Sequence, residues 1–363
     1  MQDEEYMKIA LDLAKNGLGR TSPNPLVGAV VAREGRVAAV GWHRKAGTPH
    51  AEVHALRMAG DLAKGATLYV TLEPCAHYGR TGPCAKAVIE AGIRRVVIAM
   101  EDPNPLVAGK GIAMLREAGL DVSCGLLEAE ARKLNEVFLK WIVTGMPFVT
   151  MKTAMSLDGK IATVAGKSQW ITNEASRERV HEWRDIHDGI LVGIQTVLVD
   201  NPSLTTRLPD NQGKHPVRIV LDSKGRTPTD SKLLTDGKAE TIIAVTSKAP
   251  EEHLKRLKEA GASVLVAGSG DQVDLPDLLH QLGKMEICSL FVEGGAAVNF
   301  SFLQAGLVDR VHAFIAPKLL GGREALTPVG GTGFAELSDA ALLDDIEVEN
   351  LAGDVLISGY VRK

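Results

Sequence analysis

Short apolar runs rich in β-branched residues alternate with stretches of helical periodicity through the first 145 residues. Runs at 27–32 and 37–42 lie on either side of Glu34-Gly35, a spacing that predicts a β-hairpin. A helix is predicted near 6–14, before this hairpin. After the hairpin, helices are predicted near 50–58 and 83–91, and strands at 68–72 and 95–100. Hairpin, helix, strand, helix and strand in this order predict one sheet covered by helices.

The alternation restarts after the segment 144–147, where Gly145 and Pro147 interrupt the pattern. We therefore expect two domains, residues 1–145 and 146–363. The second domain is predicted to contain strands at 148–154, 190–192, 217–221, 242–245, 264–266 and 290–292, and helices at 174–188, 251–260 and 276–282. This order is typical of a mainly parallel α/β sheet, and runs at 308–315 and 355–361 are expected to close it as an antiparallel pair.

Composition narrows the classes of function. The net charge is −4, whereas a protein that coats nucleic acid usually carries a basic surplus. Four cysteines in 363 residues are too few for a disulfide scaffold. The acidic start Met-Gln-Asp-Glu-Glu is unlike a secretory signal, and no apolar run approaches the roughly 18 residues of a membrane helix. A cytoplasmic protein that binds neither nucleic acid nor membrane is expected.

The strongest chemical motif combines His50, Glu52, Cys75 and Cys84. One histidine and two cysteines leave tetrahedral zinc an open position for water, whose pKa zinc lowers to about 7. Glu52 lies two residues after His50, close enough to take the water proton and return it to a ring nitrogen and the leaving amine. The pattern H-x-E followed by P-C and a second cysteine is typical of zinc nucleobase deaminases.

The spacing between the two cysteines departs from the usual deaminase pattern. Eight residues separate Cys75 from Cys84, where two are usual. The insert contains His77 and Arg80, which indicates a loop that recognises an anionic group such as phosphate. The alternative is a structural zinc site, in which His77 or His54 supplies a fourth protein ligand.

Other polar residues of this half have two possible interpretations each. Asn24 either caps the hairpin or holds a pyrimidine, and His43 either contacts phosphate or lies at the surface. Asp102 and Asn104 follow a predicted strand, where turn chemistry alone would explain them. The remaining cysteines, Cys124 and Cys288, have no partner at ligand spacing and are expected to be small buried residues.

The second half contains weaker signals. The segment 291–298 reads as strand, glycine turn and helix, which either binds a phosphate or is an ordinary turn. Glu293 lies at the end of that strand, where α/β sheets place ligand-binding groups. Trp170 either stacks on a ring of a ligand or packs in the core, and Arg184 and Arg207 are either phosphate clamps or solvated surface.

Motifs in both halves resemble one known family, the bifunctional riboflavin-biosynthesis deaminase–reductases called RibD or RibG. Its deaminase half resembles Asn-Pro-Leu-Val-Gly-Ala-Val-Val at 24–31, His-Ala-Glu-Val-His-Ala at 50–55, Thr-Leu-Glu-Pro-Cys at 71–75 and Asp-Pro-Asn-Pro-Leu-Val-Ala-Gly at 102–109. Its reductase half resembles Ser-Leu-Asp-Gly-Lys at 156–160, Gln-Trp-Ile-Thr at 169–172, Asp-Asn-Pro-Ser-Leu-Thr at 200–205 and Val-Glu-Gly-Gly at 292–295. The long cysteine spacer also fits this family.

The resemblance implies a cytidine-deaminase-like α/β/α domain followed by a dihydrofolate-reductase-like α/β domain. It implies zinc-dependent deamination of 2,5-diamino-6-ribosylamino-4(3H)-pyrimidinone 5′-phosphate to the corresponding uracil. NADPH would then reduce the ribosyl group of 5-amino-6-(5-phosphoribosylamino)uracil to ribityl, with hydride reaching C1′ by way of the ring-opened imine. The implied partners are these phosphorylated pyrimidines and a second copy of the chain, bound through the reductase domain.

The resemblance also implies roles for individual residues. His50, Cys75 and Cys84 would bind zinc, and Glu52 would carry protons. The first substrate would be held by Asn24, His43, His77, Arg80, Asp102 and Asn104, although the family more often has lysine at position 80. NADPH would be bound by Ala154, Trp170, Thr196, Asp200, Gly295, Ala296, Ala297, Val298, Asn299, Phe300 and Ser301. The second substrate would be contacted by Lys152, Ser168, Arg184, Leu204, Arg207 and Glu293.

Two other functions compete with this hypothesis. One is a deaminase of a free nucleoside or a tRNA base with an unrelated second domain; the lack of a basic surplus and the phosphate-suited insert argue against a tRNA substrate. The other is a zinc-stabilised scaffold with a nucleotide-sensing domain. A Glu52→Gln variant would separate catalyst from scaffold, because only a catalyst would lose an activity.

Overall fold

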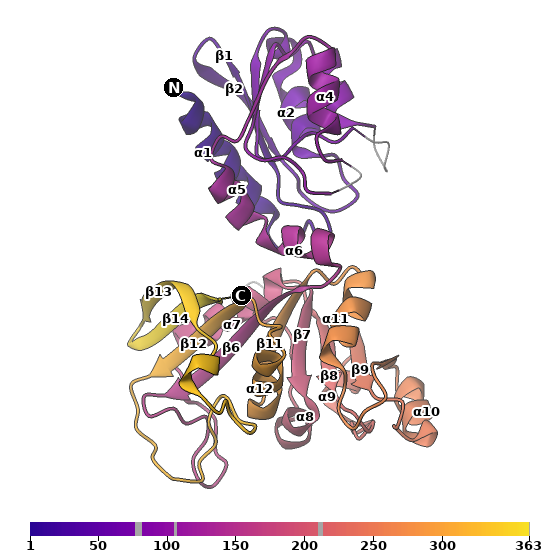
Figure 1. The fold of residues 1–363 in the computed structure, drawn as a ribbon, viewed down its shortest axis with the longest axis vertical. Coiled ribbons are helices and arrows are strands. Elements are labelled where there is room, and N and C mark those ends of the chain that lie inside the picture. Colours follow the sequence, from indigo (N-terminus) through magenta and orange to yellow (C-terminus); the bar gives the residue numbers. More distant parts are fainter. Residues whose placement is uncertain (77–81, 105–106, 210–212, 363) are drawn as a thin grey trace. The chain divides into compact units, whose positions relative to one another are not determined.

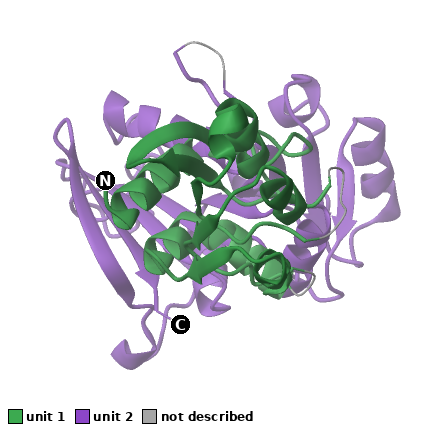
Figure 2. Ribbon diagram, turned by 90° about the horizontal axis from the view of Figure 1, so that it is seen from above, with its two compact units in different colours: residues 1–146 green, residues 147–363 purple. Residues whose placement is uncertain are grey.

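The structure, a computed structural model, describes residues 1–76, 82–104, 107–209 and 213–362. These residues form two compact units, Met1–Met146 and Pro147–Lys363, coloured separately in Figure 2. Within the described residues, no helix is long and apolar enough to cross a membrane. Each unit has its own sheet, so each is described by itself.

The first unit is built on a five-stranded sheet in the order β2-β1-β3-β4-β5. Its strands are β1 (Gly28–Arg33), β2 (Arg36–Trp42), β3 (Thr67–Val70), β4 (Arg95–Ile98) and β5 (Asp121–Cys124). The β1–β2 hairpin is antiparallel, as the Glu34-Gly35 turn predicts, and β3, β4 and β5 are parallel. Its helices are α1 (Asp3–Ala14), α2 (Ala51–Ala59), α3 (Cys84–Glu90), α4 (Lys110–Glu117), α5 (Glu128–Leu134) and α6 (Glu136–Thr144). Figure 1 shows α1 and α5 on one side of the strands and α2 and α4 on the other.

Helix α1 lies unusually close to strand β1. A Cβ atom added to Gly28 would clash with the backbone carbonyl of Ala10 and approach the amide of Ala14 to 2.9 Å. The residues on both sides of this contact are buried, with Met7 and Ala10 on the helix and Val30 on the strand. Only glycine at position 28 therefore allows the helix to cover the sheet at this distance.

A Gly28→Ala variant is expected to lose about 1–3 kcal/mol of unfolding free energy, because the helix backbone cannot move aside without unpacking the core. The midpoint of urea unfolding measures this change. Gly35→Ala is the matched control: its Cβ would contact nothing within 4 Å, and only its positive φ of 74° would cost energy, about 1 kcal/mol. Equal losses in the two variants would contradict the close-packing explanation.

The second unit is built on a nine-stranded sheet in the order β10-β9-β8-β7-β11-β6-β12-β14-β13. Its strands are β6 (Phe148–Ser156), β7 (Gly189–Gly193), β8 (Val217–Leu221), β9 (Thr241–Val245), β10 (Ser263–Val266), β11 (Ser289–Gly294), β12 (Arg310–Ala316), β13 (Leu343–Leu351) and β14 (Asp354–Val361). Its helices are α7 (Glu174–Ile186), α8 (Ile194–Asp200), α9 (Lys232–Thr235), α10 (Glu251–Glu259), α11 (Leu275–Lys284) and α12 (Ala296–Gln304). The strands β6 to β12 pair in parallel, and β12 and β14 form the expected antiparallel pair.

Several findings differ from the sequence-based picture, among them strand β5 and helices α4 to α6, which the apolar pattern did not predict. The strand β13 is an additional antiparallel edge strand, whose burial pattern is largely exposed and whose residues include many acidic ones. Cys124 is exposed rather than buried, whereas Cys288 is buried as expected. The prediction for Cys124 was wrong because β5 is the last strand of its sheet, so its side chains lack a covering neighbour on one side.

The topology brings the ends of three strands of the second unit together. Strand β11 lies between β6 and β7 and pairs in parallel with both, so the carboxyl ends of all three strands meet at one edge. The helices α8 and α12 begin directly after β7 and β11. This edge is where parallel α/β sheets bind ligands.

Candidate active sites

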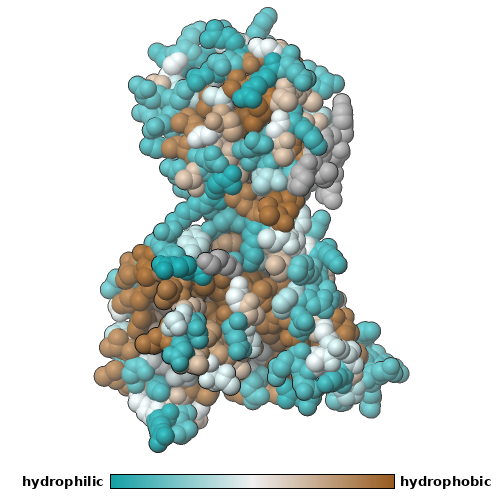
Figure 3. Space-filling view, in the orientation of Figure 1, coloured by the Kyte–Doolittle hydropathy of each residue, from teal (hydrophilic) through white to brown (hydrophobic). Residues whose placement is uncertain are grey.

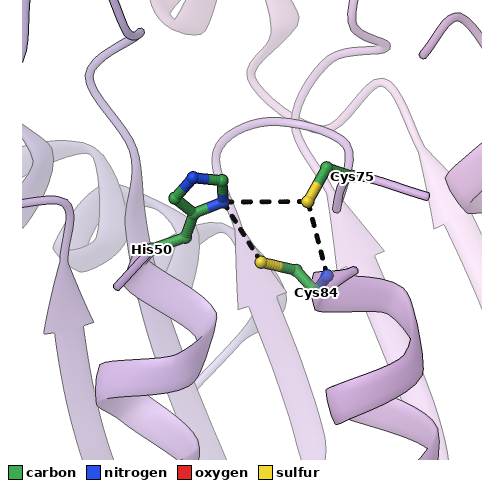
Figure 4. A group of neighbouring side chains, drawn as sticks. All are labelled: His50, Cys75 and Cys84. Carbon is green, nitrogen blue, oxygen red and sulfur yellow. Dashed lines mark hydrogen bonds between the residues drawn. The ribbon is translucent and has the colours of Figure 1, made fainter. Parts of the chain in front are cut away.

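The predicted zinc ligands lie together in the first unit. His50 immediately precedes α2, Cys84 is the first residue of α3, and Cys75 follows β3 after a short loop. The Nδ1 atom of His50 lies 3.2 Å from the Cys84 sulfur and 3.7 Å from the Cys75 sulfur (Figure 4). The three ligand atoms lie within 4.8 Å of one another, as the ligands of one tetrahedral ion require.

The donor set fits zinc with an open position. The hydrogen bond from Cys84, aided by His50, outweighs burial and lowers the pKa of Cys75, which favours the thiolate form that binds metal; the same contact and burial raise the pKa of Cys84, so the pair holds one thiolate. Within the described residues, no fourth His, Cys, Asp or Glu belongs to this cluster, so His54 is not a fourth ligand. His77, the other fourth ligand considered for a structural site, lies outside the described residues, as does Arg80.

Glu52 extends from the first turn of α2 beside the ligand cluster. Its side chain is buried, and its Oε2 atom has no hydrogen-bond partner in the part of the chain that the structure describes. Burial raises the pKa of Glu52 to about 7, although the charge of His50 acts in the opposite direction. A buried carboxyl group poised near neutral pH with one vacant acceptor is suited to carry a proton.

Asn24 and His43 form a pair beside the metal cluster. The Asn24 amide lies 3.1 Å from Nε2 of His43, and Nδ1 of His43 lies 3.2 Å from the carbonyl of Pro49. His43 is only 2% exposed, so the alternative of a surface histidine is wrong. Burial lowers the pKa of His43, so its neutral ring can donate to Pro49 and accept from the Asn24 amide. This leaves the Asn24 oxygen as an acceptor for a ligand.

Asp102 and Asn104 lie in the loop that follows β4. The backbone amide of Asn104 donates to Oδ1 of Asp102 at 2.9 Å, and Asp102 is buried. The backbone amide of Asp102 donates to Glu73, a residue of the loop that carries Cys75. Turn formation thus explains the hydrogen bond between the Asn104 amide and Asp102, but a second hydrogen bond fixes this turn to the loop that carries Cys75.

The second unit contains a buried ion pair at the shared strand edge. Arg184 of α7 donates from Nε and Nη2 to the two carboxylate oxygens of Glu293 at 2.6 and 2.9 Å. Both side chains are 11% exposed, so Arg184 is not solvated surface. Its Nη1 also donates to the carbonyl of Thr205 at 3.0 Å. Burial tends to raise the pKa of Glu293, but Arg184 outweighs it and the pKa falls to about 2.

Further charged groups surround this pair. Lys152, on β6, is half-buried; burial lowers its pKa and Glu293 opposes that shift. Arg207 is exposed, and its pKa is lowered by burial of part of its side chain and by Arg184. His181 accepts from the Arg207 amide at 3.3 Å. Sequence reasoning missed His181, although it lies three residues before Arg184, on the same face of the helix.

The start of α12 lies against the start of α8. A Cβ atom on Gly295 would lie 3.7 Å from the hydroxyl of Thr196, and one on Gly193 would lie 2.8 Å from Val298. Asn299 is buried and donates to the carbonyl of Pro328 at 2.8 Å, while its Oδ1 has no partner among the described residues. The other residues of this segment include Ala296, Ala297 and Val298 in the first turn, Phe300 against Phe334, and Ser301 donating to the Ala297 carbonyl.

The remaining predicted reductase residues differ in their surroundings. Trp170 is 62% exposed beneath the guanidinium of Arg177, so it is not a core tryptophan. Ser168 lies half-buried in the same loop, and Ala154 is two residues beyond Lys152 on β6. Leu204 is buried, and Asp200 is the exposed last residue of α8.

Comparison with known proteins identifies the family. Residues 147–357 match the family model described as the RibD C-terminal domain, and residues 1–100 match the cytidine and deoxycytidylate deaminase zinc-binding region. The riboflavin biosynthesis protein RibD of Bacillus amyloliquefaciens is 48% identical, over 99% of this chain and 96% of its own length. The chain belongs to the RibD family.

Solved structures agree with this assignment over the whole length. The RibD structure of Acinetobacter baumannii has a TM-score of 0.90 at 40% identity, covering 99% of each chain. A diaminohydroxyphosphoribosylaminopyrimidine deaminase/5-amino-6-(5-phosphoribosylamino)uracil reductase of Thermotoga maritima has a TM-score of 0.88 at 38% identity, also over 99% of each chain.

The RibD assignment defines the class of protein. The chain is a bifunctional enzyme of riboflavin biosynthesis with a zinc-dependent, deoxycytidylate-deaminase-like domain and an NADPH-dependent reductase domain of dihydrofolate-reductase-like fold. The expected fold class, activities and cofactors are thereby confirmed. The deaminase of a free nucleoside or tRNA base with an unrelated second domain and the non-catalytic scaffold are both wrong.

Proposed function

We propose that residues 1–145 deaminate 2,5-diamino-6-ribosylamino-4(3H)-pyrimidinone 5′-phosphate and that residues 146–363 reduce the ribosyl group of the product. The observation that carries the proposal is the cluster of three metal donors with Glu52 buried beside it, one of whose carboxylate oxygens has no partner among the described residues. A purely structural metal site would have no use for such a carboxyl group.

For the deamination, His50, Cys75 and Cys84 are the proposed zinc ligands, and bound zinc supplies the Lewis acidity that activates water. Glu52 takes one proton from the attacking water and delivers it to the ring nitrogen. It then transfers the proton of the resulting hydroxyl group to the amino group, which departs as ammonia when the C–N bond breaks. The Asn24 oxygen accepts from the pyrimidine, with His43 holding the amide in place. Asp102 and Asn104 complete the substrate contacts, and His77 and Arg80 are proposed to bind the phosphate.

For the reduction, NADPH supplies hydride to C1′ of the ring-opened substrate, and the residues of the strand edge bind and orient both molecules. The starts of α8 and α12 present Thr196 and the 295–298 backbone to the nucleotide phosphates. Ala154, Trp170, Asp200 and the remaining residues to Ser301 are proposed to line the same nucleotide site. Arg184, paired with Glu293, and Lys152 face the ribosyl chain, with Ser168, Leu204 and Arg207 as further proposed contacts.

The test follows absorbance and ammonia release with zinc-replete protein and the diaminopyrimidine ribosyl phosphate, first without and then with NADPH. Ammonia release before NADPH, followed by NADPH oxidation at about 340 nm, is the expected result. Ammonia release without subsequent oxidation would contradict the reductase assignment, and absence of both signals would contradict the substrate assignment.

We also propose a cytoplasmic location and a homo-oligomer formed through the reductase unit. The edge strand β13 exposes Ile346 and Val348 at 59% and 68%, and Figure 3 shows apolar surface over this side of the unit. Exposed apolar residues on a strand at the edge of a sheet favour contact with a second copy. A monomeric mass in light scattering would contradict this proposal.

A further inference from the structure

Glu73 is a buried carboxylate two residues before Cys75 that accepts four backbone amide hydrogen bonds. Its Oε2 atom accepts from the amides of Asp102 at 3.2 Å and Gly109 at 3.0 Å. Its Oε1 atom accepts from Gly111 at 2.8 Å and Ile112 at 3.1 Å. Every acceptor position of the side chain is thus directed at one stretch of chain, which begins at Asp102 and ends in the first turn of α4.

Two further contacts join the same segments. The backbone amide of Glu73 donates to the carbonyl of Met100 at 3.0 Å, in the segment between the end of β4 and Asp102. A Cβ atom on Gly111 would clash with the carbonyl of Pro74, so glycine is needed for α4 to approach the loop between Glu73 and Cys75. The metal-binding loop and the start of α4 therefore form one interlocked contact.

A helix cap alone does not explain this arrangement. A negative charge at a helix start is favourable, and the bonds to Gly111 and Ile112 would provide that stabilisation. The bond to Gly109 also serves the helix, because Gly109 is its N-cap residue, but Asp102 lies well before the helix and its bond adds nothing to the cap. The effect of the Asp102 bond, together with the bond from the Glu73 amide to Met100, is to hold the Asp102 loop at a set distance from the chain that carries Cys75.

We propose that Glu73 is a positioning residue for deamination, which sets the place of Asp102 and Asn104 relative to the metal ligands. This inference rests on the proposed function of the first unit. The side chain of Glu73 touches no reacting group; it acts by fixing the backbone of residues that contact the substrate. A small displacement of such residues weakens substrate binding strongly while leaving the proton carrier in place.

The test is the full-length Glu73→Gln variant. A glutamine amide keeps one acceptor oxygen but turns an NH₂ group toward two backbone N–H donors, so one pair of hydrogen bonds is lost. We expect the KM of deamination to rise about ten- to a hundredfold with kcat within about threefold of wild type. Zinc content by atomic emission and NADPH oxidation by the second unit are expected to be unchanged.

Asp3→Asn is the matched control for an amide in place of a bonded carboxylate in the same unit. Asp3 accepts from Arg95 and Tyr69, and Arg95 is the first residue of β4, at the end opposite the Asp102 loop. We expect a lower melting temperature and an unchanged KM. A wild-type KM in folded Glu73→Gln protein, or a KM shift no larger than that of Asp3→Asn, would overturn the inference.

A second measurement covers the case in which Glu73→Gln does not fold. Amide hydrogen exchange of the peptide 107–116 in the wild-type enzyme is compared with and without the deaminated product. Slower exchange with product is expected, because the segment that Glu73 holds is coupled to bound ligand; unchanged exchange would overturn the inference. Absence of deamination by the wild type would instead contradict the proposed function itself.

Discussion

Replacement of Glu52 by glutamine is expected to reduce ammonia release by about 10²- to 10⁴-fold while zinc stays bound. The amide keeps the size of the side chain but cannot take a proton from water. Its neighbours His50, Cys75 and Cys84 retain the same donor atoms, so metal content by atomic emission is expected to match the wild type. NADPH oxidation with the deaminated substrate is expected to be unaffected, because the reductase residues belong to the other unit.

Glu90→Gln is the control for the loss of one acidic group in the same unit. Glu90 is exposed on α3, and its contact with Lys86 at 3.7 Å is a surface ion pair, which contributes little to stability. Wild-type rates are expected for this variant. Retained deamination in Glu52→Gln would show that another group carries the proton.

The second large effect is expected from Arg184→Met. Removal of the guanidinium leaves Glu293 buried without its partner, which typically costs about 3–5 kcal/mol of unfolding free energy. Reduction is expected to fail in the folded variant as well, because the carboxylate loses the orientation that two hydrogen bonds impose. Urea unfolding and NADPH oxidation measure the two effects.

The pH dependence of the unfolding free energy provides an independent test of the same ion pair. The pKa of Glu293 lies below its ordinary value, so the pair contributes stability above about pH 4.5 and loses it as the pH falls toward about 2. In Arg184→Met, burial would raise the pKa of Glu293. At low pH the protonated, uncharged Glu293 would then cost little free energy in its buried position. The stability difference between wild type and Arg184→Met is therefore expected to shrink as the pH is lowered.

Two further variants separate the buried pair from ion pairs in general. Arg184→Met combined with Glu293→Gln is expected to recover much of the lost stability, since no buried charge remains. Arg179→Met, on the same helix, breaks a more exposed pair with Glu349 and is expected to cost no more than about 1 kcal/mol. A loss in Arg184→Met no larger than in Arg179→Met would contradict the buried-pair explanation.

The sequence predicts the metal cluster well because its ligands are residue types with a known motif, although they lie 25 and 34 positions apart. His50 and Glu52 occupy the start of one helix, Cys84 starts another, and each helix start is visible in the apolar pattern. The contact between Arg184 and Glu293 joins residues 109 positions apart, so the pattern indicates both residues but not that they pair. The role of Glu73 was missed for a similar reason, because its partners lie 29 to 39 residues away and are backbone amides.

The elements that the pattern did not predict have weak apolar periodicity or little burial. Strand β13 has mainly exposed residues and several acidic ones, so its position is determined by pairing with β14 rather than by burial. Asn24 and His43 lie just beyond the open end of the β1–β2 hairpin, where the His43 amide donates to the Val27 carbonyl, and the side-chain contact between them is not encoded in the apolar pattern. Helices and strands with a clear apolar pattern can thus be predicted from the sequence, whereas side-chain contacts between separate loops cannot.

The insertion of β11 between β6 and β7 affects how the chain folds during synthesis. Strands β6 and β7 are consecutive in sequence, but they are joined into one sheet only by β11, at residues 289–294. Strand β7 can pair earlier with β8, but the ribosome must release most of the second unit before β6 can join the same sheet. The five strands of the first unit, in contrast, are complete by residue 124. The deaminase unit can adopt its fold while the reductase unit is still being made, and the unpaired edges of β6 and β7 are exposed to chaperones or aggregation during that interval.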